Sequence, residues 1–284
     1  MGSPDVAVAP LRALVQAGFD FALVVSQPDR KRGRGGALVP TPVKAAALDF
    51  GLPVTDRVDD VLGVEADLGV VVAFGRLVRP HVLRQLPMVN LHFSLLPRWR
   101  GAAPVERAIL AGDDETGVCL MALEEGLDTG PVYGCERLAI DPDETAAELR
   151  GRLVAAGTAL LLEALSAGLG RPVPQAGEPT YAAKLAPADL ELDWERPAVE
   201  IHRLVRVGGA WTTFRQRRLK VLRSRLVGPE QSGELASGMV EGTKVGTGDG
   251  ALELVEVQPE GKAVQPATAW HNGARPAPGE RLGR

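Results

Sequence analysis

The first part of the chain alternates short apolar runs with helical patterns, and this alternation limits the possible folds more than any other feature. Apolar runs of strand length lie at 19–26, 66–74 and 88–93, and helical patterns follow at 42–50, 79–86 and 104–111. The run at 66–74 is apolar throughout, which is typical of a strand covered on both faces. Strands that alternate with helices predict an α/β fold with a Rossmann-like, mainly parallel sheet.

The pattern changes near residue 200, where short strands with turn signals replace the α/β alternation. Residues 168–196 are irregular and rich in proline, and the strands from Trp211 to Glu256 predict a small OB-like β-barrel. A length of 284 residues also fits about two domains. We therefore expect a first domain at 1–178, a linker at 179–200 and a C-terminal domain at 201–284.

Charge, cysteine content and hydropathy exclude several classes of protein. The formal net charge of −4 excludes a uniformly basic nucleic-acid coat but allows local basic patches. Two cysteines, Cys119 and Cys135, argue against a disulfide framework, and each is expected to be a small buried hydrophobe. No apolar run reaches about 18 residues, so no membrane span is expected, and we find neither a signal peptide nor a zinc signature. A reducing cytoplasm fits this composition.

Residues 89–104 carry the densest chemistry of the chain. Because side chains alternate across a strand, Asn90 and His92 point to one face of the predicted strand. The strand ends in a Ser-Leu-Leu-Pro turn, which places both near its carboxyl end, where open α/β sheets bind ligands. An unpaired buried polar group costs roughly 1–3 kcal/mol, so two on one face need a partner or a ligand.

Asp128 lies in a loop between two predicted strands, flanked by Gly126 and Gly130. These glycines permit close approach of backbone or ligand, and the carboxylate could face the same crevice as His92. An amide, an imidazole and a carboxylate without a Ser or Cys nucleophile suit direct acyl-type transfer, with Asn90 and His92 as oxyanion donors. A buried Asn–His pair that only fixes the core is one alternative. Metal binding is another, although Asn-His-Asp is a poor ligand set.

Residues 89–133 resemble the signature of the folate-dependent formyltransferases, and the resemblance extends through most of the chain. Asn-x-His, Ser-Leu-Leu-Pro and Leu-Asp-x-Gly stand where that family has them. The resemblance implies transfer of the formyl group of 10-formyltetrahydrofolate to the α-amine of methionine on initiator methionyl-tRNA, without a metal. By this resemblance Asn90 and protonated His92 would stabilise the oxyanion, and Asp128 would maintain the charge of His92 and relay the amine proton through water.

The resemblance also assigns a folate-binding surface. The turn that would bind the folate consists of Ser94, Leu95, Leu96 and Pro97. The residues that would line the pterin pocket, largely through backbone groups, are Phe74, Gly75, Arg76, Leu77, Leu123, Gly126 and Leu127. For the turn taken alone, a simple exit from the strand is the alternative.

Two basic segments indicate that the acceptor amine is on a tRNA. The first is similar to the acceptor-stem loop of tRNA-formylating enzymes, has charges that suit phosphate contacts, and comprises Arg30, Lys31, Arg32, Arg34 and the following Lys44. The second lies in the predicted barrel, a fold that commonly binds nucleic acid by a basic face, and contains Arg217, Arg218 and Lys220. A solvated surface loop and an edge strand protected by charge are the respective alternatives.

The sequence departs from the family pattern in three places. Members begin with an apolar strand before Gly-x-Pro-Asp, whereas this sequence starts at Met1, so we expect the first strand to be missing and an apolar N-terminal extension to improve solubility and activity. The segments at 87–89 and 206–210 are also short.

Two alternatives remain beside tRNA formylation: a formyltransferase for a small amine, such as an amino sugar nucleotide, or a catalytically impaired homologue that binds tRNA or folate. We expect a monomer.

Overall fold

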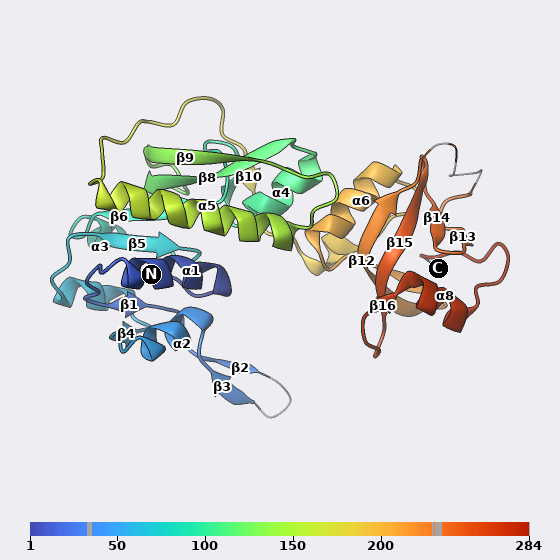
Figure 1. The fold of residues 1–284 in the computed structure, drawn as a ribbon, viewed down its shortest axis with the longest axis horizontal. Coiled ribbons are helices and arrows are strands. Elements are labelled where there is room, and N and C mark those ends of the chain that lie inside the picture. Colours follow the sequence, from blue (N-terminus) through green and yellow to red (C-terminus); the bar gives the residue numbers. More distant parts are fainter. Residues whose placement is uncertain (33–35, 229, 231–234, 284) are drawn as a thin grey trace. The chain divides into compact units, whose positions relative to one another are not determined.

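The computed structural model describes residues 1–32, 36–228, 230 and 235–283 (Figure 1). The chain divides into two compact units. The first comprises Met1–Val105, Glu115–Ala139 and Arg150–Ala183. The second comprises Glu106–Asp114, Ile140–Leu149 and Lys184–Arg284.

The first unit contains a mixed four-stranded sheet in the order β5-β6-β8-β9. Its strands are β5 (Gly69–Val72), β6 (Met88–His92), β8 (Glu115–Ala122) and β9 (Val132–Ala139). β5 and β6 pair in parallel, whereas β8 and β9 extend the sheet with antiparallel pairing. A separate parallel ladder joins β1 (Val24–Val25) to β4 (Val54–Thr55). This arrangement confirms the predicted α/β class.

Some helices of the first part of the chain begin after a capping side chain or with a proline in the first turn. They are η1 (Asp5–Ala7), α1 (Val8–Gln16), α2 (Pro42–Asp49), η2 (Val58–Gly63), α3 (Pro80–Leu83), α4 (Pro104–Ala111) and α5 (Ala146–Ser166). Thr41 caps α2, because its hydroxyl oxygen accepts a hydrogen bond from the backbone N–H of Lys44 at 3.1 Å. α5 runs along the sheet (Figure 1), and a Cβ on Gly157 would lie 2.9 Å from Val118 Cγ2, so a glycine there allows close packing.

Met1 and Gly2 lie between β1 and β5. The backbone N–H of Gly2 donates to Val25 O at 3.0 Å, and that of Val72 donates to Met1 O at 2.9 Å, so these two residues join the ladders at the carboxyl ends of both strands. A cavity of about 710 Å³ lies beside them, and its largely apolar lining includes Leu23. It is bounded by β1 and β5.

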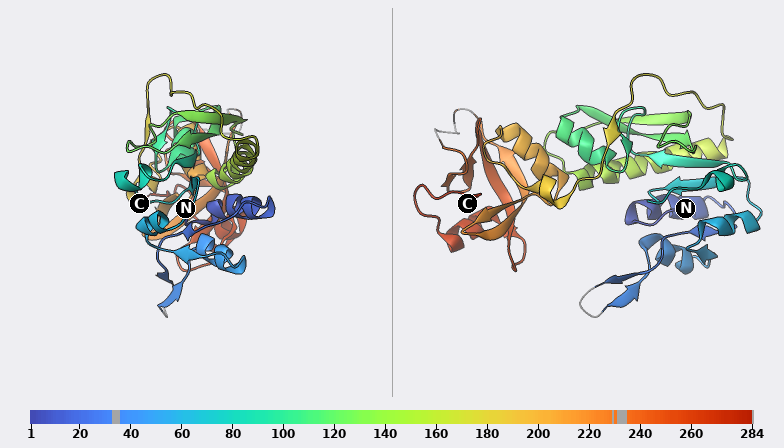
Figure 2. Two further views of the ribbon diagram at one scale, coloured as in Figure 1. Left: turned by 90° about the vertical axis from the view of Figure 1, so that its left-hand side faces the viewer. Right: turned by 180° about the vertical axis from the view of Figure 1, so that it is seen from behind.

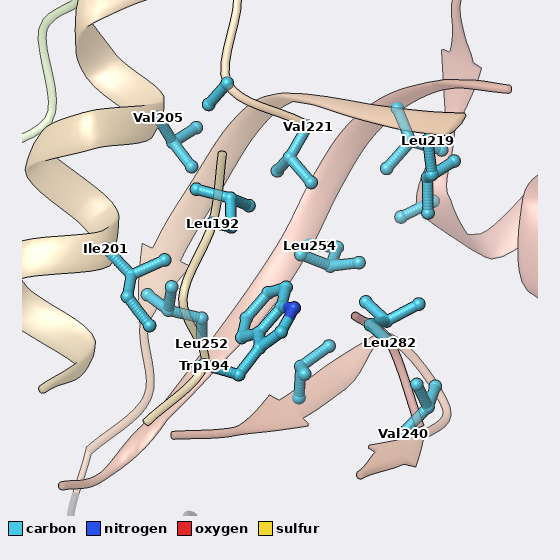
Figure 3. Close-up of a cluster of buried hydrophobic side chains, with 14 of the residues drawn as sticks. Leu192, Trp194, Ile201, Val205, Leu219, Val221, Val240, Leu252, Leu254 and Leu282 are labelled. Carbon is cyan, nitrogen blue, oxygen red and sulfur yellow. The ribbon is translucent and has the colours of Figure 1, made fainter. Parts of the chain in front are cut away.

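The second unit is a small antiparallel β-domain, as the sequence predicts. Its strands are β11 (Trp211–Phe214), β12 (Arg217–Leu226), β13 (Val240–Glu241), β14 (Lys244–Gly246), β15 (Ala251–Pro259) and β16 (Gln265–Pro266). They are ordered β11-β12-β15-β14-β13, with β16 on β15. Helical elements in this region are η3 (Pro187–Leu190), α6 (Ala198–Val207) and α8 (Ala267–Ala274). Trp194 lies among buried aliphatic residues including Ile201 and Leu252 (Figure 3), and its Nε1 donates to Thr212 Oγ1 at 3.0 Å.

Two buried basic side chains of α6 hold the segment 140–149 within the second unit. His202 lies 3.0 Å through Nδ1 from Ser224 Oγ and 3.1 Å through Nε2 from Asp143 Oδ1. Arg206 donates to Asp141 O at 2.7 Å and to Glu144 O at 2.8 Å. Burial lowers the pKa of His202, which favours its neutral form in the folded protein.

The two short segments do not disturb the elements beside them. Asn90 lies within β6, directly after the short segment 87–89. α6 ends at Val207, and the turn to β11 contains Gly208 and Gly209 with φ of 93° and 79°. Left-handed backbone of this kind is readily adopted by glycine, which explains how so short a connection is made.

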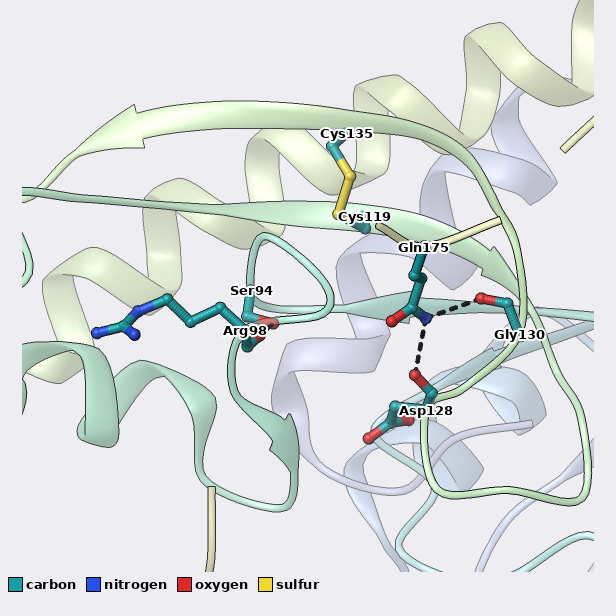
Figure 4. Close-up of a disulfide and its surroundings, with 7 residues drawn as sticks. All are labelled: Ser94, Arg98, Cys119, Asp128, Gly130, Cys135 and Gln175. Carbon is teal, nitrogen blue, oxygen red and sulfur yellow. Dashed lines mark hydrogen bonds between the residues drawn. A yellow bond between two sulfur atoms is a disulfide. The ribbon is translucent and has the colours of Figure 1, made fainter. Parts of the chain in front are cut away.

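The expectation of two unpaired cysteines is wrong. Cys119 on β8 lies opposite Cys135 on β9, and the two form a disulfide (Figure 4). They are 16 residues apart in sequence, so only the pairing of the strands brings them together. Cys119 also lies opposite His92 in the ladder between β6 and β8.

Within the described ranges, no helix is long and apolar enough to cross a membrane.

Candidate active site

Asn90 and His92 lie on β6, in the interior of the four-stranded sheet. Asn90 is half-buried and stands opposite Val71 of β5 and Met121 of β8. His92 is only 5% exposed. Among the described residues, no side-chain hydrogen bond engages the Asn90 amide, so its N–H groups are available to a ligand.

The hydrogen bonds of His92 define which ring atom can meet a substrate. Nε2 lies 2.9 Å from Trp99 O, and because a carbonyl only accepts, Nε2 carries a hydrogen. Nδ1 lies 3.6 Å from Asp128 Oδ2, which is longer than a hydrogen bond. Nδ1 is therefore the ring atom that can face a substrate, and it lies beside the Asp128 carboxylate.

Asp128 is held in place by backbone contacts. Its Oδ2 accepts a hydrogen bond from the backbone N–H of Gly101 at 2.8 Å, and its side chain is 13% exposed. Its own φ of 50° lies in the left-handed region, which a residue with a Cβ adopts at an energetic cost. A Cβ on Gly130 would lie 2.0 Å from Ala122 O, so only glycine fits there. Strain and close packing of this kind often accompany functional loops.

The turn after β6 is internally bonded. Ser94 is fully buried, and its hydroxyl donates to Arg98 O at 2.5 Å (Figure 4). The following residues are Leu95 and Leu96, which are half-buried, and Pro97, whose peptide bond is cis. Ser94 therefore stabilises the turn, whereas the half-buried Leu95, Leu96 and Pro97 have exposed atoms that can contact a ligand.

The residues predicted to line the pterin pocket fall into a packed and an exposed group. Phe74 and Leu123 pack in one hydrophobic cluster, and Phe74 O accepts from Gln27 Nε2 at 2.8 Å. Leu77 and Leu127 are 82% and 53% exposed, which is unusual for large apolar side chains. The remaining members are Gly75, with φ of 71°, Arg76, which donates to Asp56 O, and Gly126, which is exposed.

The first basic segment forms a hairpin. β2 (Arg30–Arg32) pairs with β3 (Ala37–Val39), and the hairpin extends away from the rest of the first unit (Figure 2). Arg30 donates to Gln27 Oε1, and Lys44 forms a 2.7 Å ion pair with Asp29, so the charges of both are partly engaged. Lys31 is exposed, and Arg34 lies outside the described residues.

The second basic segment is on β12. Arg218 and Lys220 are exposed, and their neighbour Leu219 is buried, as expected for alternating side chains. The Arg218 guanidinium lies 3.9 Å from the centre of the Trp211 ring, a cation–π contact. Arg217 lies 3.9 Å from Glu260, which balances its charge in part. Arg218 and Lys220 thus form an exposed basic and aromatic surface with Trp211.

A segment that is not predicted from the sequence also contacts the site. β10 (Tyr181–Ala182) pairs in parallel with β7 (Arg100–Gly101), and Thr180 Oγ1 accepts from the backbone N–H of Trp99 at 2.9 Å. Gln175 forms hydrogen bonds to the loop between β8 and β9 that carries Asp128, called here the Asp128 loop (Figure 4). No motif marks these residues, because their contacts depend on strand pairing between distant parts of the chain.

No group of three or more His, Cys, Asp or Glu in the described part of the chain is arranged to hold a metal ion.

The chain matches family models along most of its length. A family model described as "Formyl transferase" matches residues 1–165, and one described as "Formyl transferase, C-terminal domain" matches residues 184–275. The chain is 45% identical to the methionyl-tRNA formyltransferase of Roseobacter denitrificans, over 96% of this chain and 94% of that protein. It is 45% identical to that of Symbiobacterium thermophilum, over 99% and 94%.

Solved structures show a similar fold. One is the N-formyltransferase from Helicobacter canadensis in complex with folinic acid and dTDP-3-aminofucose, with a TM-score of 0.68 and 18% identity. The match covers 89% of this chain and 97% of that one. At this level of identity the likeness concerns the fold alone.

Proposed function

This chain belongs to the formyl transferase family, and we propose that it transfers the formyl group of 10-formyltetrahydrofolate to the α-amine of methionine on initiator methionyl-tRNA. The resemblance found at residues 89–133 is thereby confirmed. The proposal rests above all on near-full-length similarity to relatives named methionyl-tRNA formyltransferase. The pairing of His92 with Asp128 beside Asn90 supplies the chemistry.

In the proposed reaction, the methionine amine attacks the formyl carbon, and a bond forms between that nitrogen and the carbon. The carbonyl oxygen becomes an oxyanion, which accepts hydrogen bonds from the Asn90 amide and from Nδ1 of protonated His92. Asp128, 3.6 Å from Nδ1, stabilises the imidazolium and accepts the amine proton through a water molecule. The oxyanion then re-forms the carbonyl as the bond from the carbon to N10 of the folate breaks. N10 takes up the proton that the water and Asp128 accepted from the amine, and tetrahydrofolate leaves.

The assignment of the substrate surfaces is part of this proposal. The turn at 94–97 and the exposed Leu77 and Leu127 would bind the folate. The β2–β3 hairpin and the surface formed by Arg218, Lys220 and Trp211 would bind the tRNA backbone and bases.

The domain boundaries, the oligomeric state and the cellular location are also part of this proposal. Residues 1–178 would form the catalytic domain, 179–200 the linker and 201–284 the tRNA-binding domain. Translation initiation would place a monomeric enzyme in the cytoplasm. Disulfides are uncommon in reducing compartments, so reduced Cys119 and Cys135 in the cell would support the cytoplasmic location, and a bonded pair would argue against it.

The direct test is transfer of labelled formyl from 10-formyltetrahydrofolate to charged initiator tRNA. We expect transfer by the wild type, and a fall of about 10²- to 10³-fold or more with His92→Ala, because an oxyanion donor is lost. Transfer only to an amino sugar nucleotide would assign a small-amine substrate. Folate or tRNA binding without turnover would identify an impaired homologue, and normal transfer by His92→Ala would refute the role of His92.

A further inference from the structure

Gln175 is the centre of four hydrogen bonds beside the candidate active site. Its Nε2 donates to Asp128 O and to Gly130 O, both at 2.8 Å (Figure 4). Its Oε1 accepts from Arg100 Nε at 3.1 Å and from Nη2 at 2.7 Å. The orientation of the amide is therefore unambiguous, because a flipped amide would set its NH₂ against a guanidinium and its oxygen against two carbonyls.

The loop that Gln175 binds needs external support. Asp128 has a left-handed φ of 50°, and a residue with a Cβ keeps such a conformation only where its surroundings hold it. The two carbonyls that accept from Gln175 belong to Asp128 itself and to Gly130, two residues further on. One amide group therefore fixes the direction in which the chain leaves Asp128.

Gln175 is itself held on a segment anchored at both sides. Val173, two residues before it, exchanges two backbone hydrogen bonds with Val132 of β9, each 2.8 Å long. On the other side, Thr180 O accepts from the backbone N–H of Arg100 at 2.8 Å. Arg100 also binds the Gln175 side chain, so the glutamine joins β7 to the loop.

We propose that Gln175 is a positioning residue for formyl transfer, which holds the Asp128 loop so that the carboxylate faces Nδ1 of His92. This inference rests on the proposed function. Among the described residues, the Gln175 side chain hydrogen-bonds only to the backbone of the loop and to the Arg100 side chain, so it acts through Asp128. Gly101 donates to the Asp128 carboxylate from the strand to which Gln175 ties the loop.

Two substitutions distinguish the hydrogen bonds that the Gln175 amide donates to the loop from those that it accepts from Arg100. Gln175→Leu removes all four hydrogen bonds, whereas Gln175→Glu keeps an acceptor for Arg100 and removes both donors to the loop. Both variants lose the two hydrogen bonds to the loop, which predicts a fall in kcat of about 10- to 100-fold in each. Wild-type kcat in Gln175→Glu would overturn the proposal, because holding Arg100 would then suffice. The matched control is Gln85→Leu at an exposed position, which should leave kcat unchanged.

A double-mutant cycle tests whether Gln175 acts through Asp128. In an Asp128→Ala background, followed by single turnover with excess enzyme, Gln175→Leu should change the rate by no more than about twofold. The same 10- to 100-fold fall in both backgrounds would show that Gln175 acts elsewhere and would overturn the proposal. A merely structural effect would persist in both.

Hydrogen exchange supplies a readout that does not depend on activity. We expect Gln175→Leu to raise amide exchange in the peptide that covers 124–131, relative to wild type and Gln85→Leu. Unchanged exchange there would overturn the proposed contact. If the wild type transfers no formyl group, the proposed function fails, whereas the exchange result still decides whether Gln175 holds the loop.

Discussion

Replacement of Asp128 by Asn tests the charge relation at the centre of the proposed mechanism. The substitution keeps the size of the side chain and an oxygen that can accept from the Gly101 backbone N–H, 2.8 Å away in the wild type. It removes the negative charge 3.6 Å from Nδ1 of His92. The change is therefore mainly electrostatic.

The magnitude follows from that distance. For unit charges 3.6 Å apart, an effective dielectric constant of about 20 gives an attraction of about 4.6 kcal/mol. The side chains of His92 and Asp128 are 6% and 13% exposed, so screening by solvent is limited. Because about 1.4 kcal/mol corresponds to a factor of ten, complete loss would slow the reaction by about three powers of ten. Partial compensation by water lowers the expectation to a fall in kcat of about 10²- to 10³-fold.

The assay is single-turnover formyl transfer at saturating folate and charged tRNA, which isolates the chemical step. Glu125→Gln is the matched control, because Glu125 is an exposed carboxylate three residues earlier in the same loop. It should leave the rate unchanged. A fall of less than about fivefold for Asp128→Asn, with the same folate affinity as wild type, would refute the electrostatic role of Asp128.

Three further predictions concern packing, redox state and pH. Gly130→Ala should unfold at a lower urea concentration and lose activity, because its Cβ would meet Ala122 O. Gly151→Ala in α5, where there is open space around the residue, should raise the free energy of unfolding by about 0.5–1 kcal/mol. Reduction of the Cys119–Cys135 disulfide should lower the free energy of unfolding by about 3 kcal/mol, and equal urea midpoints with and without dithiothreitol would contradict a bonded pair. Burial lowers the pKa of His202, so the unfolded chain takes up the proton first and the free energy of unfolding should fall as pH drops below 6.5; His202→Gln should flatten this dependence in urea titrations.

The parts of the site that lie within a few residues of each other could be predicted from sequence. Asn90 and His92 are two positions apart, and the alternation of a strand places them on one side whatever the rest of the fold does. Asp128 could be assigned as their partner because the resemblance supplied the long-range link that spacing does not contain. The disulfide shows the limit, since Cys119 and Cys135 meet only through the register of β8 and β9.

The groups that orient the proposed catalytic side chains could not have been predicted, because most of them belong to the backbone. Nε2 of His92 donates to the carbonyl of Trp99, and the Asp128 carboxylate accepts from the N–H of Gly101. Every residue carries a carbonyl, and every residue except proline carries an N–H, so no residue type marks these groups. Their direction depends on the pairing of β7 with β10. Gln175 is a side chain, yet its partners in the loop are also carbonyls, and its position depends on the backbone pairing of Val173 with Val132. Residue types therefore indicate which chemistry is available, whereas contacts between distant backbone segments determine the geometry in which it operates.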